Sequence, residues 1–420
     1  MFERRIPEWL RHAPAPSVRG FATLAGCEAV ARGMLISVFP VALYDALQDA
    51  GEVSAIYFAI GLVSLLVGLL VPFVNRFIPR RVVYAMGALS FVTGAGLAAT
   101  GGAAALIAGL VLVSSATVVC FVCFNAYVLD YIARVELGRC ETLRLFYSAL
   151  GWTIGPVTGV TLWTVWRPAP FLIAALAAAA MLAVFLYMRL GNGKLITRAR
   201  RATPNPLAYL GRFLQQPRLI SGWLFAVIRS CGWWVYIVYL PIFAVENGLG
   251  DRLGGVLAST TNMALFASPL MLRWVQARSV RGAVRTGFMA CTLLFLAAGL
   301  SGALPWIAIA ALFSASIFLI LLDICGGLPF LMAVKPSERT EMSAIYSSFR
   351  DVSGILTPGV AWVILLAAPV PAVFAAAGAA SLIAWRIAGH LHPRLGEHRI
   401  RFPEEAPPRV PAGTPLPSQQ

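Results

Sequence analysis

Long apolar runs separated by short polar turns follow one another from residue 21 to residue 388. Each run has about 20 residues, the length that an α-helix needs to cross the hydrocarbon core of a bilayer. The breaks between them contain the Gly, Pro and charged residues that are typical of loops. This pattern predicts twelve membrane-spanning helices over residues 21–44, 53–74, 82–100, 104–129, 143–165, 170–188, 219–244, 253–272, 284–302, 305–331, 342–366 and 371–388.

The composition indicates the same class of protein. Hydrophobic residues make up 59% of the chain and charged residues only 12%, whereas soluble domains carry about 25% charged residues. A chain of 420 residues with so little polar surface cannot cover several soluble domains. We expect an all-α polytopic membrane protein that is surrounded by lipid.

The basic residues are distributed unevenly along the chain. Most of the 33 Lys and Arg residues lie near the termini and in alternate loops, and the opposite loops hold only Arg167 and Arg252. Basic residues are concentrated in the cytoplasmic loops of membrane proteins. We therefore expect an even number of spans with both termini in the cytoplasm. The net charge of +15 is explained by this orientation, so we expect no nucleic-acid partner.

A basic, polar segment at residues 189–218 separates two apolar halves of similar plan. Landmarks of the first half recur about 200 positions later: Pro40 as Pro241, Gly87 as Gly287 and Gly155 as Gly354. Two halves that both begin on the same side of the membrane predict two pseudo-symmetric six-helix bundles arranged as parallel repeats. The expected organisation is a cytoplasmic segment at 1–20, a bundle at 21–188, a cytoplasmic linker at 189–218, a bundle at 219–388 and a disordered cytoplasmic tail at 389–420.

With this layout, residues 20–390 resemble the major facilitator superfamily (MFS) of transporters. The family motif in the loop between helices 2 and 3 is partly matched by PFVNRFIPRR, residues 72–81, and more faintly by PLMLRWVQARSVR, residues 269–281. Three arginines of the first copy fit the motif: Arg76, Arg80 and Arg81. Asn75 stands where the family has Asp, and both motif glycines are missing. The resemblance implies a charge-paired latch at the cytoplasmic face, which we expect to be weaker or built differently here.

The fifth predicted helix resembles the family's antiporter motif. It contains four residues of the motif, Gly151, Gly155, Pro156 and Gly159, and Val160 replaces the final glycine. Glycines at every fourth position let two helices approach closely. Proline leaves one carbonyl of its helix without a donor and bends the helix. The resemblance implies an exporter, and a tight helix crossing without that function is the alternative.

Six ionisable side chains fall inside predicted spans: Glu28, Arg32, Arg229, Asp323, Arg350 and Asp351. A charge at this depth costs about 2.5–3.5 kcal/mol on insertion scales, so each one needs a partner or a function. All six lie roughly 10–16 Å from the predicted cytoplasmic helix ends at 1.5 Å per residue. The resemblance implies a central cavity lined by helices 1, 4, 7 and 10, with one mixed-charge cluster in its inner half. Two interpretations remain open, structural salt bridges or a site where a substrate anion competes with a protonatable carboxylate for an arginine.

Other polar and aromatic residues extend this candidate site. Asn125 is placed to bind a substrate or a neighbouring helix. Trp233 and Tyr236 follow Arg229 at i+4 and i+7 and share a face with it. They are candidates for stacking on a planar substrate or on the Arg229 guanidinium, or for lipid-facing packing. Asp130 and Arg134 belong to a charged loop between the fourth and fifth helices, which predicts a salt-bridge network that steadies the inner gate.

We find no sequence feature of an enzyme. The four histidines lie near the termini, and the pair Cys120 and Cys123 lies in an apolar helix without a second pair. Neither pattern indicates a metal site, and the chain lacks a nucleotide-binding loop. We expect no cofactor and no disulfide.

The preferred hypothesis is a secondary transporter that binds a small-molecule solute and moves it by alternating access, with proton-coupled efflux. The alternatives are a proton-coupled importer of an organic anion and a non-transporting receptor or scaffold. Arginine supplies all but two of the basic residues, Lys194 and Lys335, which is typical of a GC-rich bacterial genome. We expect a monomer in a bacterial inner membrane.

Overall fold

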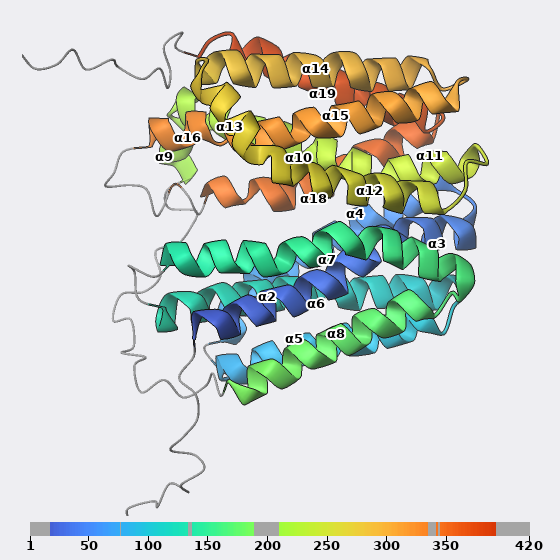
Figure 1. The fold of residues 1–420 in the computed structure, drawn as a ribbon, viewed down its shortest axis with the longest axis vertical. Helices are drawn as coiled ribbons and strands as arrows, with labels where there is room; N and C mark the ends of the chain where they lie inside the picture. The colour runs from blue at the N-terminus through green and yellow to red at the C-terminus, as the bar shows by residue number, and fades with distance from the viewer. Residues whose placement is uncertain are drawn as a thin grey trace, which may run out of the picture.

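The computed structural model describes residues 17–75, 77–132, 137–188, 210–334, 342 and 345–391. Every regular element in these ranges is a helix. Figure 1 shows two stacked groups of roughly parallel helices, which we call the first and second halves. The first half consists of α2 (Val18–Ile36), α3 (Val38–Leu47), α4 (Ala50–Val74), α5 (Arg80–Ala99), α6 (Ala103–Tyr131), α7 (Leu137–Val165) and α8 (Ala169–Tyr187).

The second half begins with the short α9 (Leu210–Leu214), which lies inside the predicted linker at residues 189–218. That linker is therefore helical at its end, and the rest of it lies outside the described residues. The remaining elements are α10 (Pro217–Trp234), η3 (Val235–Tyr239), α11 (Leu240–Glu246), α12 (Arg252–Ala264), η4 (Leu265–Ala267), α13 (Ser268–Gln276), α14 (Val280–Leu300), α15 (Pro305–Cys325), α16 (Leu328–Ala333), α18 (Phe349–Leu365) and α19 (Pro371–Ala388).

Each of the twelve predicted spans corresponds to a helix or an interrupted helix. In the described part of the chain, 9 of these helices are long and apolar enough to cross a membrane. The other three are α7, which contains Pro156 and several glycines, the run α12–η4–α13, which is divided by a 3₁₀ turn, and α18, which has 17 residues. The chain is a multi-pass membrane protein.

Two predicted spans are interrupted at equivalent positions. The first divides into α2 and α3 at Ser37, and the seventh contains the π-helix η3 between α10 and α11. Pro40 and Pro241 each follow a break, and an α-helix would need their missing N–H groups to bond the carbonyls of Ile36 and Ile237. The prolines therefore explain why the α-helical hydrogen-bond pattern stops before them.

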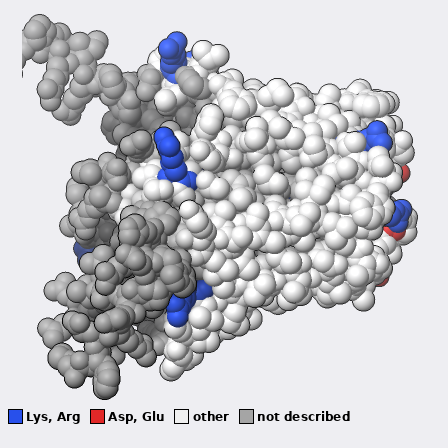
Figure 2. Space-filling model, turned by 60° about the horizontal axis from the view of Figure 1, so that its bottom comes forward, with Lys and Arg blue, Asp and Glu red and all other residues white. Residues whose placement is uncertain are grey.

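The two ends of the molecule differ in charge. The basic end is the end at which α2 begins, α4 ends and α19 ends, and it carries Arg80, Arg218 and Arg386. At the opposite end, short turns join α3 to α4, α5 to α6 and α7 to α8, and we call it the short-turn end. It carries Arg167 and Arg252, and Arg167 forms an ion pair of 2.8 Å with Asp45. Figure 2 shows blue side chains at both ends of one face with a wide white band between them. This distribution is that of a protein with an apolar belt facing lipid.

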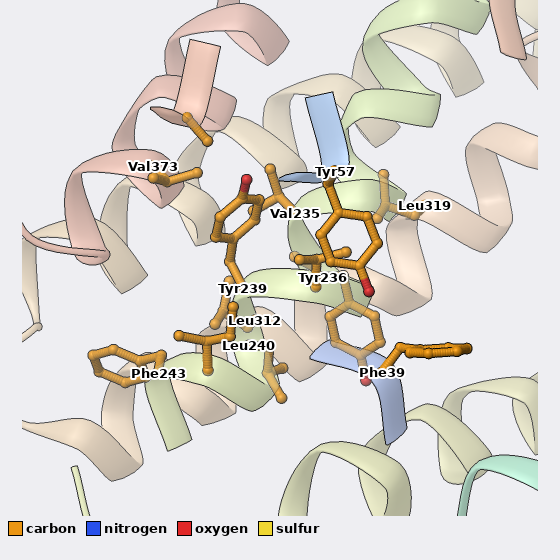
Figure 3. Packing of buried hydrophobic residues seen from close by; sticks show 14 of the residues in the cluster. Phe39, Tyr57, Val235, Tyr236, Tyr239, Leu240, Phe243, Leu312, Leu319 and Val373 are labelled. Carbon is orange, nitrogen blue, oxygen red and sulfur yellow. The ribbon is translucent and has the colours of Figure 1, made fainter. Parts of the chain in front are cut away.

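The two halves are joined near the short-turn end. Figure 3 shows Phe39 and Tyr57 of the first half in one apolar cluster with Tyr236, Tyr239 and Phe243 of the second half. The Tyr239 hydroxyl donates to Ser54 Oγ at 2.9 Å. Helix α4 packs against α18, and α7 packs against α12.

Toward the basic end, the first half has a hydrophobic core of its own. This separate core is centred on Phe21, Tyr84, Phe124 and Phe185. On the basic-end side of the α7–α12 contact, α7 exposes Phe146 (73%) and α13 exposes Leu270 (65%). The halves are thus packed together at the short-turn end and form separate cores at the basic end.

Candidate functional site

A cavity of about 410 Å³ lies between the two halves. Its wall is formed by α2, α3, α4, α6 and α7 of the first half and by α10, η3 and α18 of the second. Most of the lining is apolar, but Arg32, Arg350 and Asp351 reach it. Ligand sites for small molecules are commonly clefts of about 300–1,000 Å³ with a few polar groups on an apolar wall. The cavity has the size and chemistry of such a site.

A smaller cavity of about 220 Å³ adjoins the first one. Trp152 and Trp233 line both cavities, and the smaller one also contacts Tyr236, Asn262 and Asp323. The two spaces therefore share an aromatic wall. A change in the position of Trp233 would alter both of them.

The closest ion pair at this site joins α10 to α15. Arg229 Nε lies 2.9 Å from Asp323 Oδ1, and Trp233 Nε1 donates to Asp323 Oδ2 at 2.9 Å. Arg229 and Trp233 are one helical turn apart, so both side chains reach the same carboxylate. Nε of Arg229 is close enough for an ion pair but is not aligned as a hydrogen-bond donor. Asp323 keeps 39% of its side-chain surface, which faces the smaller cavity.

The first half has a second ion pair. Arg32 Nη1 lies 3.3 Å from Glu28 Oε1, one helical turn apart on α2. The Arg32 guanidinium also lies over the Trp152 ring, 5.2 Å from its centroid. Arg32 lines the main cavity, whereas Glu28 lines neither cavity. The sequence predicted one mixed-charge cluster. Among the described residues, the structure shows two ion pairs at these cavities, Arg32–Glu28 and Arg229–Asp323, with Arg350 and Asp351 on the wall of the main cavity.

Arg350 lies where α18 meets the first half. Its guanidinium lies 5.6 Å from the ring centroid of Phe121 on α6 and 5.7 Å from that of Phe349. Within the described residues, no carboxylate is within ion-pair distance of Arg350. Both Arg350 and its neighbour Asp351 are exposed to the main cavity.

Two predicted site residues lie elsewhere. Asn125 is half-buried on α6 and lines neither cavity. Tyr236 is buried and faces the smaller cavity, where its hydroxyl forms a hydrogen bond of 2.7 Å with Thr261. Thr261 in turn forms a hydrogen bond of 2.8 Å with Ser316. Tyr236 is therefore held by the second half and does not line the main cavity, as a predicted stacking residue would.

The glycines of α7 pack directly against α2. A Cβ on Gly155 would lie 2.6 Å from the carbonyl carbon of Gly33, and a Cβ on Gly151 would lie 2.6 Å from the backbone of Ala29. A Cβ on Gly159 would collide with the carbonyl oxygen of Met34. The tight crossing predicted from the sequence is present, and its partner is α2.

The sequence did not identify the residue that satisfies the carbonyl left free by Pro156. In an α-helix this carbonyl belongs to Trp152, four residues earlier. Asn262 Nδ2 of α12 donates to it at 2.6 Å, which links the two halves. Asn262 also lines the smaller cavity.

The predicted latch at the basic end is only partly within the described residues. Asn75 caps the C-terminus of α4, and its buried Oδ1 has no hydrogen-bond partner among the described residues. The Arg80 guanidinium lies 5.3 Å from the Tyr127 ring centroid, and Arg81 is exposed. Arg76 and Arg134, and the side chain of Asp130, lie outside the described part of the structure. The salt-bridge network stays a prediction.

A helical membrane protein whose two halves enclose a charged cavity of small-molecule size is a membrane transporter in its architecture. Comparison of the sequence with family models gives the same class. A model of the Major Facilitator Superfamily matches residues 21–358. The chain belongs to this family.

Solved structures show the same fold at low sequence identity. The nucleoside transporter NupG has a TM-score of 0.68 at 13% identity, covering 89% of this chain and 98% of its own. A POT family transporter in complex with 5-aminolevulinic acid has a TM-score of 0.68 at 14% identity, covering 88% and 95%. A POT family transporter in complex with a thioalcohol-conjugated peptide has a TM-score of 0.66 at 14% identity, covering 88% and 95%. No curated protein matches this chain in sequence.

Proposed function

We propose that the protein is a secondary active transporter that exports a small organic solute in exchange for protons by alternating access. The observation that carries this proposal is the charged cavity of about 410 Å³ between two halves that are joined near the short-turn end. Rocking of the halves about this cavity would close one end and open the other. The Arg229–Asp323 pair at the adjoining cavity supplies a group that can change its charge.

In this proposal the basic end faces the cytoplasm of a bacterial inner membrane, and the protein acts as a monomer. The basis for the orientation is the concentration of arginines at that end. The separate core of the first half at the basic end then belongs to a conformation in which the solute reaches the cavity from the cytoplasm. Export would begin from this conformation.

Asp323 is the proposed proton acceptor. Its carboxylate contacts Arg229 and Trp233 through one oxygen each, and part of its surface remains open to the smaller cavity. Protonation removes the negative charge, so the ion pair with Arg229 is lost. Arg229 would then need another anion or water, and this change would bias the packing of α10 against α15.

Efflux is favoured over uptake because the glycines of α7 resemble the antiporter motif and form a close contact with α2. Uptake of an organic anion together with protons is the second candidate. Arg350, which faces the main cavity without an ion-pair partner in the described structure, favours that alternative.

The test uses the full-length protein in proteoliposomes. A ligand that raises the melting temperature of the purified protein, chosen from a metabolite and drug panel, serves as the transported solute. An imposed pH gradient should drive its movement, and Asp323→Asn should abolish the dependence on the gradient. Asp45→Asn, which breaks the ion pair at the short-turn end, is the matched carboxylate control and should retain this dependence.

Three outcomes separate the hypotheses. Movement of the solute that ignores the gradient in the wild type contradicts proton coupling. Movement in the same direction as the protons favours uptake over exchange. Binding without any movement favours a receptor or scaffold.

A further inference from the structure

Two arginines face the main cavity from opposite halves of the molecule. Arg32 projects from α2 and Arg350 from α18, and both line the same space. Like charges on opposite halves repel each other, and an anion bound by both arginines would reduce that repulsion.

Both guanidinium groups rest on aromatic rings. Arg32 lies over Trp152 at 5.2 Å, and Arg350 lies between the rings of Phe121 and Phe349 at 5.6 and 5.7 Å. A guanidinium that stacks by its face keeps the N–H donors at its edge available. These donors can form paired hydrogen bonds with a carboxylate.

Among the described side chains that line the main cavity itself, positive charges outnumber negative ones. Glu28 pairs with Arg32 at 3.3 Å but lines neither cavity. Asp323 is occupied by Arg229 and Trp233 in the adjoining space. The described lining of the main cavity contains two arginines, Arg32 and Arg350, and one carboxylate, that of Asp351. The cavity wall therefore favours an anion.

The remainder of the wall suits a flat apolar group. Tyr57 and Trp234 come from opposite halves and meet edge to face at 6.1 Å. Phe39, Trp152 and Trp233 add three further rings to the lining. Aromatic rings bind one another in stacked or edge-to-face arrangements.

We propose that the solute is an aromatic organic anion whose carboxylate is bound jointly by Arg32 and Arg350, with its ring system held among the aromatic side chains of the cavity. This inference rests on the proposed transporter function and applies to either direction of transport. A shared anion replaces repulsion between the halves with two attractive contacts. Its binding would draw α2 and α18 together and favour closure of the basic end.

The test measures binding of three probes with the same ring to the purified full-length protein by calorimetry. The probes are 2-naphthoate, the neutral 2-naphthamide and the cationic 2-naphthylmethylammonium. We expect 2-naphthoate to bind at least about tenfold more tightly than the other two, which is the effect of one charge-assisted hydrogen bond. Equal binding of the amide, tighter binding of the ammonium probe, or no binding of 2-naphthoate would overturn the inference.

Variants locate the effect at the two arginines. Arg32→Gln and Arg350→Gln should each weaken binding of 2-naphthoate by at least about tenfold and leave binding of 2-naphthamide unchanged. Arg252→Gln, at the short-turn end, is the matched control and should bind all three probes as the wild type does. Normal binding of 2-naphthoate by both cavity variants would contradict the joint site. The selectivity of the wild type among the probes tests the inference even if a variant fails to fold.

The binding result is independent of transport. If 2-naphthoate binds as expected but does not cross the membrane in proteoliposomes, the substrate-class inference survives as a binding property and the transporter proposal fails. If a non-anionic solute is transported and 2-naphthoate does not bind, the transporter proposal survives and the present inference fails.

Discussion

The hydrogen bond between Asn262 and the Trp152 carbonyl should matter only because Pro156 is present. Proline cannot donate to the carbonyl four residues before it, and Asn262 of the other half supplies the missing donor at 2.6 Å. Asn262→Ala would leave this half-buried carbonyl without a protein donor. In Pro156→Ala, the new N–H would donate to the same carbonyl from within α7, so the asparagine would become dispensable.

The size of this effect follows from measurements on membrane helices. A side-chain hydrogen bond between such helices stabilises by about 0.6 kcal/mol on average and by at most about 1.7 kcal/mol. The short distance and the unsatisfied acceptor place Asn262→Ala toward the upper end, at about 1–1.5 kcal/mol of unfolding free energy. In the Pro156→Ala background, we expect a loss close to zero. The coupling free energy of the double-mutant cycle should therefore be about 1 kcal/mol.

The assay is reversible unfolding in mixed micelles, monitored by tryptophan fluorescence. Asn247→Ala is the matched control, because Asn247 Nδ2 also donates to a backbone carbonyl, that of Phe243, at 2.8 Å but within its own half. Its cost should be the same with Pro156 or Ala at position 156. If Asn262→Ala costs as much with alanine there as with proline, the assignment of Asn262 to the freed carbonyl is wrong.

Three further predictions concern the two halves and the cavities. Gly155→Val should prevent stable folding, because the new side chain would collide with the backbone of α2. The measurement is loss of the monodisperse peak in size-exclusion chromatography. The control is Gly96→Val, which should fold normally because a Cβ at position 96 meets no atom within 4 Å. Trp233→Phe keeps a ring but removes the N–H that donates to Asp323. It should therefore weaken pH-gradient-driven transport by about fivefold or more, the effect of about 1 kcal/mol, and retain 2-naphthoate binding. Unchanged transport would contradict the role of the indole N–H. Spin labels at Leu145 of α7 and Leu270 of α13, both exposed and on the basic-end side of the α7–α12 contact, should move closer when 2-naphthoate is added. An unchanged distance would contradict closure of that end.

The positions of the helices were predictable because each span must be about 20 apolar residues long. The sequence also located the six ionisable groups within the spans, since a charge in an apolar run is visible without a structure. It did not indicate the breaks at Ser37 and at Val235–Tyr239. Pro40 and Pro241 were recognised only as landmarks of the internal repeat, although each also prevents one α-helical hydrogen bond.

The pairing of the charged groups depends on helix packing and could not be predicted. Arg229 and Asp323 are far apart in the chain, and their contact requires a particular rotation of α10 against α15. Arg32 and Glu28 were predictable as a pair because they are one helical turn apart. Asn262 carries no recognisable sequence signal, because its acceptor is a backbone carbonyl in the other half.

Coupling between a solute and a proton requires that the two sites affect each other. The main cavity and the carboxylate of Asp323 are linked by Trp233, whose ring lines both cavities and whose N–H donates to that carboxylate at 2.9 Å. A solute that stacks on this ring and rotates it would weaken the hydrogen bond and destabilise the ionised carboxylate. Protonation of Asp323 would, by the same linkage, release the indole toward the main cavity. In this form solute binding and proton binding favour each other, so the indole of Trp233 gives a local physical route for the second candidate, uptake of the solute together with protons. Exchange would instead require that the bound solute strengthen this hydrogen bond and so oppose protonation of Asp323.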